Sequence, residues 1–121
     1  MAYYLVTAKL KETEGKLYET LVQELQNRSY LPIKPFGIEI TKALTKARIR
    51  PDGIATWEEE DYCNPPLREE KLAVLDKYFE DIEVRDIGKK GNGWEEILDL
   101  PRLLPQVDIY IDPNEEESFG I

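Results

Sequence analysis

The chain has 121 residues, 41% of them hydrophobic and 34% charged, which suits one domain that buries a core without disulfides or metals. Its formal net charge of −9 argues against nucleic acid as a main partner, because affinity for that backbone depends on Lys and Arg. The lack of histidine removes the usual general base near neutral pH and, with a single cysteine, excludes a structural zinc site.

The first predicted element is a strand over residues 3–10, YYLVTAKL, whose two faces both carry apolar side chains, as in a central strand. A helix follows from Lys16 to about Arg28. It is predicted from apolar residues at helical spacing, namely Leu17, Leu21, Val22 and Leu25.

Residues 38–46 fit two patterns. Ile38 and Ile40 alternate as in a strand, and this interpretation places a bulge near Lys42. A helical stripe is the alternative, carried by Ile40, Ala43, Leu44 and Ala47. We favour the strand, because it leads directly into a hairpin.

The hairpin has its turn at residues 51–53, Pro-Asp-Gly, in which proline presets φ for the first turn position and glycine takes the left-handed conformation. Its strands are predicted over residues 44–50 and 54–62. The expected cross-strand pairs are Arg50 with Ile54, Arg48 with Thr56, Ala47 with Trp57 and Lys46 with Glu58.

The second half of the chain continues with a predicted helix over residues 67–80 and an alternating strand over residues 82–87. GKKGNG, residues 88–93, is expected to be a flexible turn, since it lacks the spacing of a phosphate-binding loop. A short helix from Trp94, stopped before Pro101, and a last strand over residues 107–111 complete the order.

This order up to Ile87 predicts an α+β domain: a βαββαβ antiparallel sheet with two helices on one face. The right-handed crossover rule places the first strand beside the third, with both central. The order, with YYLVTAKL as the first strand, resembles the ferredoxin-like folds and in particular the dimeric α+β-barrel proteins. The resemblance covers about residues 2–87 and implies two sheets packed face to face, with a small pocket between sheet and helices.

We therefore expect one domain over residues 1–121, with a ferredoxin-like core in 1–87 and a C-terminal extension in 88–113 that adds a short helix and an extra strand. The acidic residues 114–121 are predicted to be a flexible tail. The lone cysteine, Cys63, and the lack of a signal-peptide pattern or long apolar stretch predict a cytoplasmic protein with no membrane segment.

The hairpin carries the candidate site residues. Strand alternation separates the acids of residues 58–61 onto two faces, so they are interpreted as a solvated strand end with no metal site. If the protein is an enzyme, Glu59 or Asp61 is the candidate catalytic base. Candidate ligand-binding residues are an arginine that would hold an anion and two aromatic pocket walls: Arg48, Trp57 and Tyr62.

The basic run of Lys46, Arg48 and Arg50 is interpreted as cross-strand ion pairing, with Lys46 opposite Glu58. Its alternative is an anion-binding or RNA-phosphate row. Cys63 is expected to be a half-buried, inert thiol, because no histidine is present to activate it.

The leading functional prediction is a homodimeric binding or interaction protein without a cofactor, for which a small anion is one candidate ligand. The dimer would bury the sheet face that the helices leave uncovered. The alternative is a dimeric α+β-barrel-type enzyme that acts on a small anionic metabolite through a carboxylate base.

Overall fold

Strands β1 (Ala2–Leu10) and β3 (Ile54–Asp61) form the centre of a four-stranded antiparallel sheet in the computed structural model, which describes residues 2–61 and 63–111. The strand order is β2-β3-β1-β4, with β4 (Phe79–Asp86) beside β1 at one edge. Placing the first and third strands together in the middle was therefore correct. The domain is α+β, as predicted from the order of its elements.

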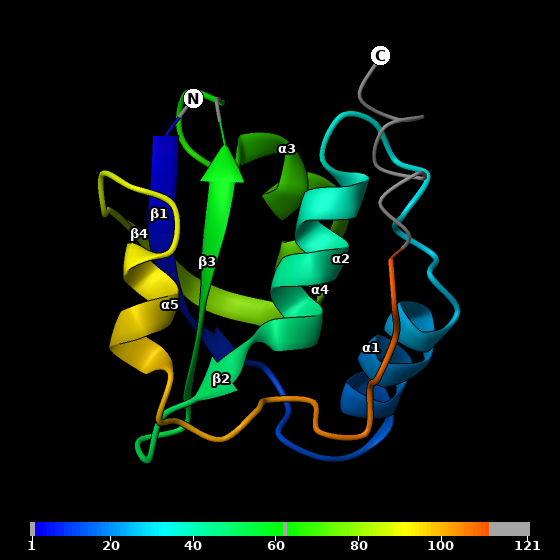
Figure 1. Ribbon diagram of the computed structural model, residues 1–121. Coiled ribbons are helices and arrows are strands. Elements are labelled where there is room, and N and C mark those ends of the chain that lie inside the picture. The colour runs from blue at the N-terminus through cyan, green and yellow to red at the C-terminus, as the bar shows by residue number, and fades with distance from the viewer. Residues whose placement is uncertain (1, 62, 112–121) are drawn as a thin grey trace.

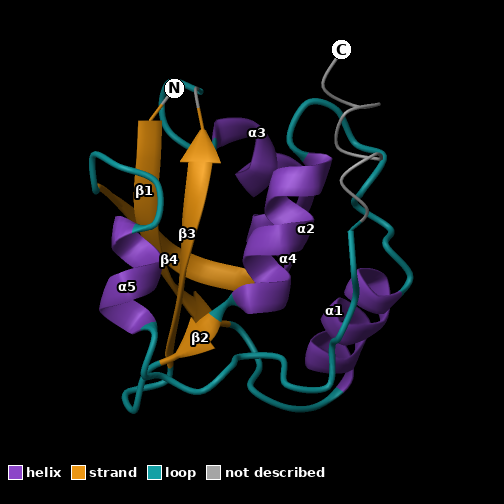
Figure 2. Cartoon of the chain, viewed as in Figure 1, coloured by secondary structure: helices purple, strands orange, loops and turns teal. Residues whose placement is uncertain are grey.

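One face of this sheet is covered by helices from three parts of the chain: α1 (Lys16–Gln26), α2 (Gly37–Lys46) and a helical segment over residues 68–78 (Figure 1). That segment consists of α3 (Arg68–Glu70), a π-helical turn η1 (Lys71–Leu75) and α4 (Asp76–Tyr78). The core between helices and sheet includes Val6, Trp57, Leu21, Leu25, Ile40, Leu44, Leu75 and Phe79. Helix α5 (Asn92–Ile97) lies on the opposite side of β3 (Figure 2).

The strand predicted over residues 38–46 was wrong, because this segment is helix α2. Its side chains at helical spacing, Ile40, Ala43 and Leu44, are buried in the core, whereas a strand would have turned half of them to solvent. The helix begins at Gly37, which packs directly against the backbone carbonyls of Tyr30 and Leu31. The connector before it therefore determines where α2 sits.

The hairpin was predicted with the correct register but with too long a first strand. Arg48 pairs with Thr56, and Arg50 N–H donates to the Ile54 carbonyl. Strand β2 spans only Arg48–Ile49, because α2 continues to Lys46. The predicted pairs of Ala47 with Trp57 and Lys46 with Glu58 therefore do not form. Beyond Trp57, the outer edge of β3 is flanked by α2 instead of a strand (Figure 2).

The C-terminal extension also differs from its prediction. Its helix, α5, begins at Asn92 and ends at Ile97. Residues 107–111 form no strand and run past α2 towards α1, where Tyr110 accepts a hydrogen bond from Arg28 (Figure 1). Segment 98–107 is instead attached by an isolated bridge between Arg48 and Arg102. The predicted acidic tail lies outside the described residues.

The second face of the sheet, which the predicted dimer would bury, carries α5 across β3. Leu5 and Ile97 are buried there, and Arg85 of β4 forms an ion pair with Glu96 of α5 at 2.7 Å. The sheet positions next to α5 are polar, namely Thr7, Lys9 and Glu83. Among the described residues, this face is therefore partly covered by α5 and also carries polar side chains.

Candidate functional site

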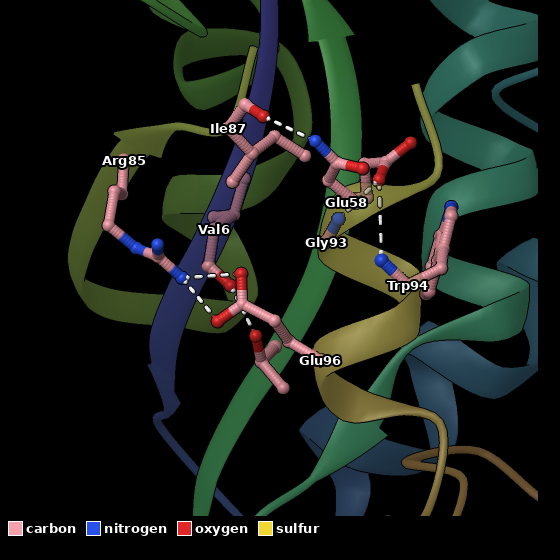
Figure 3. A network of polar contacts seen from close by, with 9 residues as sticks. Val6, Glu58, Arg85, Ile87, Gly93, Trp94 and Glu96 are labelled. Carbon is pink, nitrogen blue, oxygen red and sulfur yellow. Dashed lines mark hydrogen bonds and ion pairs between the residues drawn. The ribbon is translucent and has the colours of Figure 1, made fainter. Parts of the chain in front are cut away.

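The glycine-rich turn of residues 88–93 does bind an anion, and the anion is a side chain of the protein. The carboxylate of Glu58 on β3 accepts hydrogen bonds from the backbone N–H groups of Gly93 at 2.9 Å and Trp94 at 3.3 Å (Figure 3). It also accepts one from the N–H of Gly91 at 2.9 Å. Gly91 has a φ of 94°, which turns its N–H towards that carboxylate. The loop thus binds a carboxylate of the same chain, and this contact anchors α5 to the central strand β3.

This anchor places Trp94 beside a hollow of about 440 Å³, which we call the basic hollow. The hollow lies between α2, α5 and the segment around residues 98–109. Its lining consists of Thr45, Lys46, Arg48, Trp94, Leu98, Arg102, Asp108 and Ile109. Three of these side chains are cationic and one is acidic, so the hollow is positively charged in a protein of net charge −9.

Two arginines hold the walls of the basic hollow together. Arg48 donates from Nη1 to the carbonyls of Leu98 and Leu100, the latter at 2.6 Å. Arg102 donates to the carbonyl of Thr45 at 2.8 Å and also to that of Val107. Because carbonyl oxygens carry only partial charge, both guanidinium groups keep their positive charge while their positions are fixed.

Two buried polar atoms of the basic hollow have no hydrogen-bond partner within the described chain: Thr45 Oγ1 and Arg48 Nε. Thr45 is only 9% exposed. A buried donor or acceptor left without a partner costs about 1–3 kcal/mol, so most such groups in folded proteins are satisfied. Both atoms belong to residues that line the basic hollow, so they are polar groups beside it that still lack a partner.

A second hollow of about 260 Å³ adjoins the first and shares Lys46 and Trp94 with it. Its other lining residues are Tyr3, Glu39, Lys42, Ala43, Glu58, Glu60, Lys90 and Gly91, so lysines and acids balance. Glu58 is held by α5, and Glu39 Oε1 accepts the Glu60 N–H at 3.0 Å. Partial burial raises the pKa of Glu39. This mixed-charge hollow selects less clearly for an anion than the basic hollow does.

The residues proposed from the sequence fall into two places. Trp57, Glu59 and Asp61 point to the helix-covered face and are buried there. Trp57 packs against Phe79 with ring centroids 5.1 Å apart. Asp61 accepts the N–H of Leu67. None of these three lines either hollow. Arg48 points to the other face and lines the basic hollow, and Tyr62 lies outside the described residues.

The three residues of the basic run, Lys46, Arg48 and Arg50, also lie in two different places. Lys46 and Arg48 both line the basic hollow, whereas Arg50 forms an ion pair with Asp52 in the hairpin turn. The predicted ion pair of Lys46 with Glu58 is replaced by the backbone cradle of α5. Cys63 is half-buried, and desolvation raises the pKa of its thiol, which opposes nucleophilic activation.

Sequence reasoning did not single out Glu70, which lies within the helix predicted over residues 67–80. It is 1% exposed and lies in the core beside Glu59. Desolvation is the largest cause that raises its pKa, to about 7. Its position four residues before Val74 and eight before Tyr78, both buried, was the available signal. Trp94, Thr45 and Arg102 were also missed, because their convergence depends on contacts between distant segments.

Comparisons with known proteins do not place the chain in a family. No family model matches it, and neither the curated proteins nor the solved structures that were compared gave a match. Within residues 2–61 and 63–111, no group of three or more Cys, Asp or Glu side chains is arranged to hold a metal ion. None of the helices in the same ranges has the length and apolar character to cross a bilayer.

Proposed function

We propose that this protein is a binding domain for a small anionic ligand, which it holds in the basic hollow. The observation that carries the proposal is the convergence of Lys46, Arg48 and Arg102 on one hollow that also contains the unpaired Thr45 Oγ1 and Arg48 Nε. An anionic oxygen there would gain charge-assisted hydrogen bonds and satisfy two buried polar atoms at once.

The lining also suggests the shape of the ligand. Trp94, Leu98 and Ile109 provide an apolar wall next to the cationic groups. A volume of about 440 Å³ is in the range of small-molecule sites, which combine apolar walls with a few placed polar groups. We infer a ligand with one carboxylate or phosphate group and a compact apolar or aromatic part.

The arrangement of the acids favours binding over the enzyme alternative. A carboxylate base must be within hydrogen-bond reach of its substrate. Glu59 and Asp61 lie in the helix-covered core and line neither hollow, whereas Lys46, Arg48 and Arg102 line the basic hollow. The two acids are therefore separated from the residues that would hold the anion.

We further infer that the core belongs to the ferredoxin-like class, supported by the strand order β2-β3-β1-β4, with α2 as an additional helix before a shortened β2. We also propose that the protein is cytoplasmic and forms a homodimer. Since α5 covers the second sheet face, a dimer would have to use another surface. Light scattering at micromolar concentration tests this, and a strict monomer would remove the dimer from the proposal.

The binding proposal can be tested by ¹H–¹⁵N NMR titration with phenyl phosphate and benzoate as probes and benzyl alcohol as the uncharged comparison. We expect the anions, and not the alcohol, to shift the amides of Thr45, Arg48 and Trp94. Lys46→Gln should weaken binding, because the exposed Lys46 contributes charge to the hollow. Arg50→Gln is the matched control, since Arg50 belongs to the same basic run but lies outside the hollow.

Absence of saturable shifts at millimolar anion would refute the proposal. So would equal loss of affinity in Lys46→Gln and Arg50→Gln, which would indicate nonspecific attraction to the basic run.

A further inference from the structure

The core contains two carboxyl groups that meet between β3 and the helical segment 68–78. Glu59 is 0% exposed and Glu70 is 1% exposed. Trp57 Nε1 donates to Glu59 Oε1 at 2.8 Å. The other three carboxyl oxygens of the pair, Glu59 Oε2 and both of Glu70, find no donor within the described chain when both groups are ionised. A proton on either group supplies one, because the carboxyls are close enough to hydrogen-bond each other.

Among the described residues, the charged groups that act most strongly on this pair from outside are acidic: Asp61, two residues along the same face of β3, and Glu39 on α2. Tyr4, which pairs with Glu59 across β1 and β3, carries a phenol and adds no cation. Two ionised carboxylates at this position would repel each other in a medium of low dielectric.

The backbone next to Glu70 departs from regular geometry. Glu70 is the last residue of α3 and is followed at once by the π-helical turn η1. The helical segment begins after Leu67, which has a φ of 64°, and the N–H of Leu67 is held by Asp61. Single π-helical turns are uncommon and occur often at functional positions. The junction that carries Glu70 thus departs from regular α-helical hydrogen bonding.

We propose that Glu59 and Glu70 form a proton-dependent latch, which holds segment 68–78 against the sheet while the two carboxyl groups share a proton and loosens it when that proton is lost. The latch is independent of the basic hollow, since neither residue lines it. The latch responds to solvent pH, and it controls how Val74, Leu75 and Tyr78 pack on the sheet.

The direction of the effect follows from linkage. Burial, the largest cause, raises the pKa of Glu70 from 4.5 to about 7 and that of Glu59 well above its ordinary value. The contribution of such a group to stability is fully present below its unfolded-state pKa and is lost as the pH rises through its folded-state pKa. For Glu70 the window therefore runs from 4.5 to about 7. The latch is closed on the acidic side and opens towards alkaline pH.

Hydrogen exchange at the amides of residues 68–78, corrected for intrinsic rates, tests the latch at about pH 5.5 and about pH 8.5. We expect protection in this segment to fall about tenfold or more over that range, relative to α1. Glu70→Gln mimics the protonated acid and should keep protection nearly constant. Glu69→Gln is the matched control, because Glu69 is the exposed neighbour and should leave the wild-type response unchanged.

The latch is refuted if wild-type protection in residues 68–78 does not change with pH, or if it falls equally in Glu70→Gln. Should Glu70→Gln fail to fold, ¹³C titration of the glutamate side chains in the wild-type protein decides. Two buried carboxyls titrating at their ordinary pKa would overturn the proposal, and one that keeps its proton to near-neutral pH would support it.

Discussion

Glu58 Oε1 lies 2.9 Å from the backbone nitrogen of Gly93, and a Cβ on residue 93 would stand only 3.1 Å from the same oxygen. The central strand and the last helix are therefore joined by one carboxylate that packs tightly against the glycine at residue 93. Glu58 is 4% exposed, so its charge is stabilised by N–H dipoles in place of water.

Replacing Glu58 with Gln should destabilise the protein by about 2–3 kcal/mol, because the amide keeps one acceptor oxygen but turns an NH₂ group towards backbone donors. Urea denaturation measures the change. Glu83→Gln, an exposed acid on the same sheet face, is the control and should be nearly neutral. Equal midpoints for the two variants would show that the cradle contributes nothing to stability.

A second prediction concerns Gly37 at the start of α2. A Cβ at this position would overlap the carbonyl oxygens of Tyr30 and Leu31, which are backbone atoms and cannot move independently. Gly37→Ala should therefore displace α2 and cost about 3 kcal/mol or more, seen as a lower thermal midpoint. Gly88→Ala is the comparison. Its φ is 76° but it has open space around it, so only conformational strain of about 1–2 kcal/mol is expected. A larger loss for Gly88→Ala would contradict this interpretation.

Helix α2 shows why part of the fold could not be predicted from the sequence. Residues 38–46 satisfy both periodicities locally, and the close fit of Gly37 against residues 30–31, which is tertiary, decides for the helix. The hairpin register was predictable because Pro51 to Gly53 fixes it within a few residues. Arg48 lines a hollow, but its neighbours there, Arg102 and Trp94, come from about 50 residues away, a distance that no local pattern spans.

Trp57 was predicted as a pocket wall, and its buried position leads to a different expectation. Trp57→Phe removes the indole N–H that donates to Glu59 and leaves a small cavity beside Phe79. The loss of both should cost about 2–4 kcal/mol in guanidinium denaturation. The indole hydrogen bond also lowers the pKa of Glu59, so its removal should raise that pKa further and steepen the loss of stability towards alkaline pH.

Trp94→Phe is the matched control for this change, since Trp94 is only half-buried and lines the hollows. It should cost less stability and leave the pH dependence as in the wild type. If the pH profile of Trp57→Phe parallels that of the wild type, the hydrogen bond between Trp57 and Glu59 is not coupled to the buried acids.

The last prediction concerns Arg48, whose guanidinium holds the segment at Leu98 and Leu100 and whose Nε has no partner among the described residues. Arg48→Lys keeps the positive charge but removes the Nε donor and the planar fork. We expect it to weaken phenyl phosphate binding about tenfold, close to the free energy of one charge-assisted hydrogen bond. Lys46→Arg should bind nearly as the wild type, because only charge is required at that position. Calorimetry measures the affinities of both variants. Equal affinities for Arg48→Lys and the wild type would contradict the prediction. They would show that ligand recognition depends on charge alone and that Arg48 Nε takes no part.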